Sequence, residues 1–330
     1  MLALWDTTGT DVVRKLAAER RSAGGVASGL ALTLIAVAEE PQIRAVEDAV
    51  TIAAAEHPCR LLVVSRDPLG GRADAPSKLD AEIVVGGRLG PCEAVVLRMS
   101  GRLALHAESV VMPLLAPDVP VVTWWHGEPP DRIAYDPLGV VAERRITDVA
   151  VCPDPISALR QRANDYAPGD TDLAWTRITP WRTLIAGAFD TISAPVTAVH
   201  VVASADDPTA ALLGGWLQAR LGVAPTAVPA EDGLQAVRIE LSGGTEFALT
   251  RRNGRATMHC TGFEDRTLPL VPRRLGDELA EELRRLDADQ PYAAALAAAT
   301  GAAGLNDRPA TRVHVWHDPA LAERPEAAAL

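Results

Sequence analysis

Apolar runs and amphipathic stretches alternate along the first half of the chain. Apolar residues recur at helical spacing over 11–21 and again after Pro41, which predicts two helices. The continuous apolar runs 26–38 and 60–65 predict buried strands, so strand, helix and strand follow one another as in layered α/β folds. The pattern continues with strands predicted over 81–85, 94–99 and 119–124 and helices over 102–112, 136–145 and 156–164.

The pattern changes after Ala194-Pro195, which we interpret as a linker. A strand and a helix come first, and the helix is expected to begin at Asp207-Pro208, an N-cap followed by proline. Short alternating segments follow, and Asn253-Gly254 between two of them is the pair most typical of a two-residue hairpin turn. The predicted elements are strands over 196–203, 234–241, 246–251, 255–260 and 312–316 and helices over 208–221, 275–286 and from 291.

These elements predict a mixed α/β (α+β) protein of two domains. We expect residues 1–193 to form a mixed, largely parallel sheet with flanking helices. Residues 194–330 are expected to form a βα unit, an antiparallel meander and C-terminal helices. The length of 330 residues agrees with two domains of about 150 residues each.

Charge and composition narrow the possible partners. The net charge of −11 argues against a nucleic-acid surface and against binding to anionic membranes. The longest apolar stretch, 27–38, is shorter than the about 20 residues that span a bilayer, and the chain starts without a signal-peptide pattern. With only four cysteines, the sequence predicts a cytoplasmic protein.

Motifs for catalysis, metals and cofactors are weak. The glycines of 24–29 follow a helix and precede a strand, which is the reverse of a dinucleotide-binding loop. His314 and His317 would face opposite sides of a strand, which suits a metal ion poorly. His126 has no carboxylate or nucleophile close to it in sequence. We therefore predict no catalytic residue, no metal and no cofactor.

Tryptophan is concentrated in two places. The segment 170–182 reads DTDLAWTRITPWR, and Thr179-Pro180 predicts the start of a helix with Trp181 on its apolar side. Trp124 and Trp125 end a predicted strand and should point to opposite faces, so one of them needs a second layer, a second domain or a partner. Tryptophan is usually buried and is also enriched in binding hot spots, so a core seam and a partner surface both remain open.

Charged residues flank the tryptophans. Arg144 and Arg145 could end a helix, where cations complement the helix dipole. Alternatively, Arg145 could join Asp148, Asp172 and Arg177 in a charged rim around the tryptophans, as in an interface with an apolar centre and a polar edge.

Four short motifs follow one another along the chain between residues 120 and 182. They read PVVTWWHGEPP at 120–130, DPL at 136–138, RRITD at 144–148 and DTDLAWTRITPWR at 170–182. In this order they resemble the glucose-6-phosphate dehydrogenase assembly protein family (OpcA). The resemblance implies a non-enzymatic protein that binds glucose-6-phosphate dehydrogenase and favours its active oligomeric form, which supplies NADPH in the pentose phosphate pathway.

The hypothesis assigns partner contacts to ten residues. They are Trp124, Trp125, His126, Arg145, Asp148, Asp172, Trp175, Arg177, Trp181 and Arg182. One alternative is a sugar-phosphate-binding protein or an enzyme that uses an Arg/Trp pocket. Another is a scaffold in which every tryptophan belongs to the core.

Overall fold

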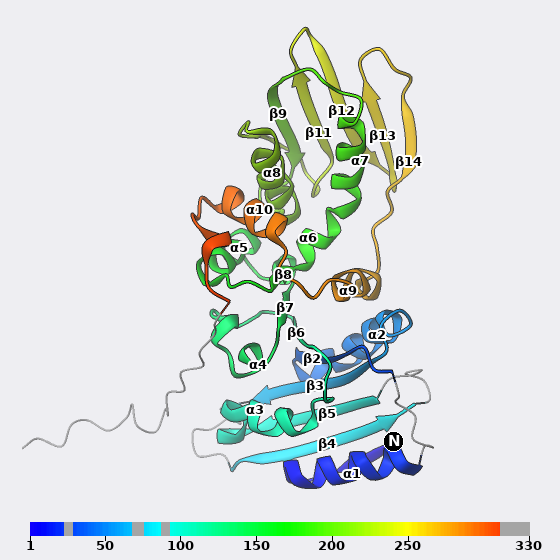
Figure 1. Cartoon of the computed structure of the whole chain (residues 1–330), viewed down its shortest axis with the longest axis vertical. Coiled ribbons are helices and arrows are strands. Elements are labelled where there is room, and N and C mark those ends of the chain that lie inside the picture. The colour runs from blue at the N-terminus through cyan, green and yellow to red at the C-terminus, as the bar shows by residue number, and fades with distance from the viewer. Residues whose placement is uncertain (23–28, 68–75, 87–92, 311–330) are drawn as a thin grey trace, which may run out of the picture.

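The computed structural model describes residues 1–22, 29–67, 76–86 and 93–310, and Figure 1 shows their arrangement. The strands of these residues form an eight-stranded sheet, here sheet A, and a six-stranded sheet, here sheet B. Sheet A lies at one end of the long axis and sheet B at the other, with short helices between them (Figure 1). The fold is therefore mixed α/β with two sheets, as the sequence predicted.

Sheet A has the strand order β1-β4-β5-β3-β2-β6-β7-β8. The six strands from β5 to β8 in that order are parallel, and β4 and β1 are added at one edge in antiparallel pairing. The strands are β1 (Leu2–Leu4), β2 (Leu32–Ala38), β3 (Cys59–Asp67), β4 (Lys78–Val85), β5 (Glu93–Ser100), β6 (Val121–His126), β7 (Arg144–Thr147) and β8 (Asp170–Asp172).

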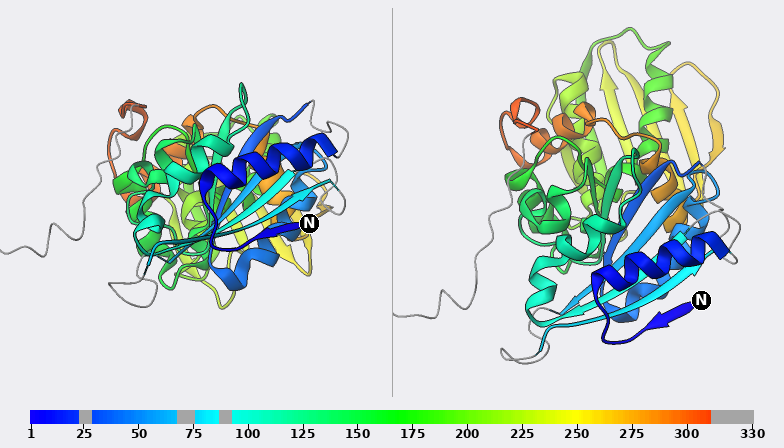
Figure 2. Two further views of the ribbon diagram at one scale, coloured as in Figure 1. Left: turned by 90° about the horizontal axis from the view of Figure 1, so that it is seen from below. Right: turned by 60° about the horizontal axis from the view of Figure 1, so that its bottom comes forward.

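Helices cover both faces of sheet A, which explains why its central strands are apolar throughout. One face packs against α2 and α9 and the other against α1, α3 and α4. The second view of Figure 2 shows α1 lying across the sheet near the N-terminus. The α-helices of the described residues are α1 (Gly9–Ser22), α2 (Ile43–Ala53), α3 (Ala107–Val111), α4 (Pro137–Val140), α5 (Pro155–Asp165), α6 (Leu173–Arg177), α7 (Thr179–Phe189), α8 (Pro208–Leu221), α9 (Leu275–Leu283) and α10 (Gln290–Thr300).

Sheet B has the order β10-β9-β11-β12-β13-β14. Only β10 and β9 are parallel, and the other pairs are antiparallel, which confirms the predicted meander. Asn253 and Gly254 turn the β12–β13 hairpin with positive φ angles of 50° and 72°, as expected for this pair. The strands are β9 (Val196–Ala203), β10 (Thr226–Pro229), β11 (Ala236–Leu241), β12 (Thr245–Arg252), β13 (Arg255–Cys260) and β14 (Arg266–Pro269).

Helix α9 leaves sheet B and returns to sheet A. Leu279, Ala280 and Leu283 of α9 belong to the same core as α2, and Figure 1 shows the two helices side by side. Conversely, α5, α6 and α7 precede sheet B in the chain but contribute to the core beneath it. The two sheets are thus tied together by elements that cross between them, and the division at residues 193 and 194 stays a prediction.

Several predicted elements were wrong in detail. The helix expected over 136–145 ends at Val140, and Arg144 and Arg145 lie on β7, so the helix-dipole interpretation of these arginines was wrong. Thr179 does not cap α7, because its hydroxyl accepts a hydrogen bond from Arg182 Nη2 at 2.8 Å and not from the helix backbone. The segment 102–112 is mostly 3₁₀ turns, with α3 as its one short α-helix.

Some predictions fall on other parts of the chain. The strand expected over 312–316, and with it His314 and His317, lies outside the described residues. The same holds for most of the glycine-rich segment 24–29 and for the beginning of the strand expected over 26–38, of which β2 forms the second half.

Candidate functional site

All four tryptophans of the predicted site are buried inside the chain. Trp124 packs between sheet A and helices α2 and α9. Trp125 points to the opposite face, on the side of Thr123, whose hydroxyl donates to the carbonyl oxygen of Leu138 in α4 at 2.7 Å. The second layer that one of these tryptophans needed is therefore supplied by the chain itself.

Trp175 and Trp181 belong to the core beneath sheet B. They come from the neighbouring helices α6 and α7, and the indole N–H of Trp175 donates to the Asp289 carboxylate at 2.9 Å. Each of these two side chains is at most 2% exposed, so the isolated chain offers almost none of their surface to a partner. Their direct contact with a partner stays a prediction.

Arg145 is fully buried and joins β7 to β8. The strand register places it opposite Asp170, and its Nε donates to that carboxylate. Its two Nη atoms donate to the carbonyl oxygens of Ala142 at 3.1 Å and Pro168 at 2.9 Å. Gly169 allows the close approach: with φ of 97°, its missing Cβ would lie 2.3 Å from the Glu143 carbonyl oxygen. Each nitrogen of this guanidinium makes at least one hydrogen bond within the chain.

Arg177 connects three elements. Its Nη1 and Nη2 donate to Asp148 at 2.7 and 2.6 Å, and its Nε donates to Glu278 of α9 at 3.1 Å. Burial works to lower the pKa of Arg177, but hydrogen bonds and charge from the two carboxylates outweigh it and raise that pKa. Arg177 therefore remains a cation whose charge is already matched.

Asp172 ends β8 and caps α6. Its carboxylate accepts from the Thr147 hydroxyl at 2.6 Å and from the N–H groups of Val149 and Ala174 at 3.0 and 2.9 Å. Burial, together with the nearby charge of Asp148, raises the pKa of Asp172 to about 6. These contacts fix the loop and helix that follow β7 and β8.

Arg182 differs from the other predicted arginines. Its guanidinium stacks on Trp175, 3.6 Å from the ring centroid, and its Nη2 donates to Thr179. In the described part of the chain no carboxylate forms an ion pair with it, and its Nε has no hydrogen-bond partner. Burial lowers the pKa of Arg182 to about 10. It faces a pocket of about 460 Å³ that Trp216 and Arg285 also line.

His126 is half-buried at the end of β6. Its ring lies 5.1 Å from the ring of Trp124, and burial lowers its pKa against the opposing charge of Asp148. The imidazole is thus held in its neutral form at neutral pH.

A second pocket, of about 610 Å³, borders Arg177, Trp181 and Arg251 between the two sheets. The arginines of this pocket bear on the sugar-phosphate alternative, because a phosphate site needs cationic side chains whose N–H groups are free. Arg177 is already paired with two carboxylates, and Arg273 donates to the Thr176 carbonyl oxygen at 2.8 Å and pairs with Glu281. Two of the three arginines that border this pocket are therefore committed to partners within the chain, and the third, Arg251, lies 5.9 Å from the ring centroid of Trp181. A single uncommitted arginine does not favour a phosphate site.

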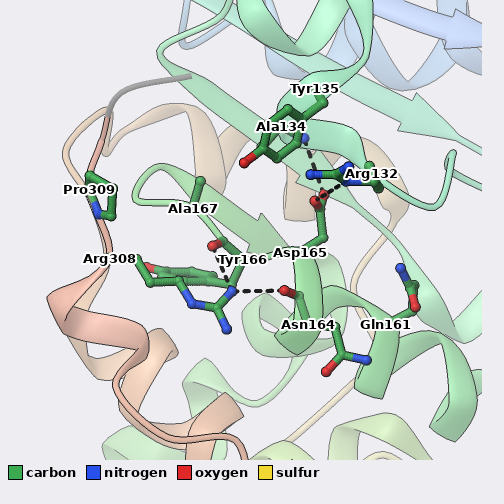
Figure 3. Close-up of a pocket in the computed structure, with 10 residues that line it drawn as sticks. All are labelled: Arg132, Ala134, Tyr135, Gln161, Asn164, Asp165, Tyr166, Ala167, Arg308 and Pro309. Carbon is green, nitrogen blue, oxygen red and sulfur yellow. Dashed lines mark hydrogen bonds and ion pairs between the residues drawn. The ribbon is translucent and has the colours of Figure 1, made fainter. Parts of the chain in front are cut away.

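Figure 3 shows a third pocket, of about 460 Å³, which the sequence did not indicate. Arg308 closes one side and donates to the carbonyl oxygens of Asn164 and Tyr166, each at 3.0 Å. Arg132 lies over Tyr135 on the other side, 3.9 Å from its ring centroid. The lining residues are far apart in sequence, so no local pattern could have revealed this pocket.

Within the described ranges, no cluster of three or more His, Cys, Asp or Glu side chains is placed to hold a metal ion. The same ranges contain no helix long and apolar enough to cross a membrane. Cys59 and Cys152 are buried and Cys260 is half-buried, and burial raises the pKa of Cys152 to about 11. Cys92 lies outside the described residues.

Two family models match consecutive parts of this chain. Residues 50–164 match the model described as glucose-6-phosphate dehydrogenase subunit N-terminal domain, and residues 168–296 match the corresponding C-terminal domain. The chain belongs to the OpcA family. The resemblance carried by the tryptophan-rich segments is confirmed.

Two curated relatives carry the OpcA name. The protein named OxPP cycle protein OpcA of Synechococcus elongatus is 28% identical over 195 residues, which cover 55% of this chain and 44% of the relative. The protein of the same name from Synechocystis sp. is 27% identical over 143 residues, which cover 42% of this chain and 30% of the relative. The chain thus matches less than half the length of these relatives.

Solved structures resemble the chain only distantly. A 3-ketoreductase from Actinomadura kijaniata in complex with NADP and TDP-benzene aligns at 11% identity with a TM-score of 0.45, covering 82% of this chain and 95% of that chain. An NAD binding oxidoreductase from Klebsiella pneumoniae aligns at 12% identity with a TM-score of 0.41, covering 84% and 98%. At these scores the likeness says nothing about activity.

Proposed function

We propose that this OpcA-family chain is a non-enzymatic assembly factor and activator of glucose-6-phosphate dehydrogenase. The observation that carries the proposal is that both matching family models, over 50–164 and 168–296, are described as parts of a glucose-6-phosphate dehydrogenase subunit. On this proposal the chain acts in the cytoplasm and supports NADPH supply through the pentose phosphate pathway.

Activation without catalysis works through a shift between states of the partner. The chain favours the active oligomer only to the extent that it binds that oligomer more tightly than the inactive form. The charged side chains at the ends of β7 and β8 fit this role, because Asp148 and Asp172 are committed to internal hydrogen bonds. Such groups hold the shape of the loop and helix that follow these strands.

The part of the predicted site that suits partner contact is the edge at Arg182. The half-buried guanidinium feels the charges of Asp289, Glu281 and Glu282 but forms no direct ion pair within the described residues, and an acidic side chain from a partner would supply one. The flat face of Trp175 beneath it fixes the guanidinium, and Trp and Arg are the residues most enriched in hot spots. The remaining residues of the predicted site would then support this contact from within.

The deciding experiment is an activity titration. Glucose-6-phosphate dehydrogenase from the same organism is assayed at low substrate with increasing amounts of this chain. We expect a saturable rise in activity whose endpoint gives the stoichiometry, and co-elution of the two proteins on size exclusion. An unrelated protein of similar net charge serves as the control. Unchanged activity together with separate elution would contradict the proposal.

A further inference from the structure

The parallel part of sheet A has a well-known strand order. Its strands run β5-β3-β2-β6-β7-β8, and numbering these six by their order in the chain gives 3-2-1-4-5-6. This is the order of dinucleotide-binding sheets, in which the ligand lies outside the carboxyl ends of the first and fourth strands. In this chain those strands are β2 and β6, and Ala38 pairs with His126 where they end.

A pyrophosphate at this place needs a glycine-rich turn and free N–H groups at the start of the next helix. Here β2 is followed by Glu39, Glu40, Pro41 and Gln42, and then by α2. Pro41 has no N–H to offer. The Gln42 N–H donates to the Glu39 carbonyl oxygen at 2.9 Å, and the Glu39 N–H donates to Gln42 Oε1 at 3.1 Å. Pro41 and Gln42 therefore have no free N–H group to give to a phosphate.

The space for a pyrophosphate is also filled. Gly127, directly after β6, has φ of 116°, and a Cβ there would lie 3.2 Å from Oε1 and 3.3 Å from Nε2 of Gln42. The side-chain amide of Gln42 therefore rests on the backbone at Gly127, between the carboxyl ends of β2 and β6. Two carboxylates lie just before α2: Glu40 pairs with Arg98 at 2.7 Å, and Glu39 is exposed. The charge of Glu39 would repel phosphate.

One feature of nucleotide binding is kept. Asp67 ends β3, the position from which a carboxylate binds the ribose in dinucleotide-binding sheets. A ribose contact alone does not replace the pyrophosphate contacts at the helix N-terminus, which the order of the sheet would otherwise supply.

We infer that the point where β2 and β6 end is closed to dinucleotides, so that this chain uses a dinucleotide-type sheet as a scaffold. Any NADP bound in an assembly with a dehydrogenase is then held by the dehydrogenase. This inference does not rest on the proposed function, because it concerns the isolated chain.

The test is thermal unfolding of the full chain alone with NADP⁺, NADPH and inorganic pyrophosphate at about 1 mM, since a ligand that binds the folded state raises Tm. We expect Tm to stay unchanged, while an NADP-dependent dehydrogenase run in parallel shows its shift. A saturable rise in Tm with NADPH that the D67N variant abolishes would overturn the inference. That result would leave the activity titration unaffected, so the two proposals fail separately.

Discussion

At the scale of single residues, Arg145 shows how much of the predicted site is internal structure. We expect Arg145→Met to lower the free energy of unfolding by about 3–5 kcal/mol, because it leaves the buried Asp170 carboxylate without its cation. Urea unfolding would measure the loss. Arg14→Met is the matched control: its pair with Asp11 is on the surface, and we expect a loss of about 1 kcal/mol or less. Equal losses in the two variants would contradict this account of Arg145.

The tryptophans show what single residues could and could not reveal. Strand alternation correctly placed Trp124 and Trp125 on opposite faces of sheet A. Whether both faces are covered depends on α4 and on α9, which begins 149 residues after β6 ends. No local pattern reports such distant cover, so the sequence could not separate core tryptophans from interface tryptophans.

At the scale of elements, the return of α9 to α2 depends on Gly276. A Cβ at this position would lie 2.5 Å from Ile52 Cβ and 2.6 Å from the Ala49 carbonyl oxygen. We expect Gly276→Ala to cost about 1–3 kcal/mol by overpacking the helix crossing. Its matched control is Gly187→Ala in α7, where no atom lies within 4 Å of the added Cβ and alanine favours the helix by up to about 1 kcal/mol. Urea unfolding of both variants gives the comparison, and a neutral Gly276→Ala would show that α9 can shift freely.

Elements with a local cause were predictable and those with a distant cause were not. The β12–β13 hairpin follows from Asn253-Gly254, and α8 from the cap at Asp207, both short-range signals. Strand β7 was misread as helix because its arginines look solvated. They are buried because Asp170 and Glu282 of other elements neutralise them, and Glu282 is 138 residues from Arg144.

At the scale of the whole molecule, elements cross between the two sheets. The core between sheet A and helices α2 and α9 and the core beneath sheet B therefore each contain residues from both halves of the sequence. Helix α9 shows this most clearly, since it packs on α2 and also carries Glu278 and Glu282, which bind Arg177 and Arg144. A change in the placement of α9 would therefore move Arg144 at the start of β7 and Arg177 in α6, and Arg144 lines the same pocket as Arg182. The shape of the surface around Arg182, the proposed partner contact, therefore depends on the correct placement of both sheets.

The last prediction separates contact with the partner from support of the fold. We expect Arg182→Gln to weaken activation of glucose-6-phosphate dehydrogenase at least about tenfold in the concentration needed, because it removes the cation that an acidic partner side chain would meet. Its Tm should stay near that of the parent, since no ion pair within the described residues is lost.

Trp181→Ala should instead lose stability by about 3–5 kcal/mol and activation with it, because Trp181 fills the core beneath sheet B. Arg220→Gln, an equal change of charge at the exposed end of α8, is the control and should change neither. Full activation by Arg182→Gln would move the contact away from this pocket.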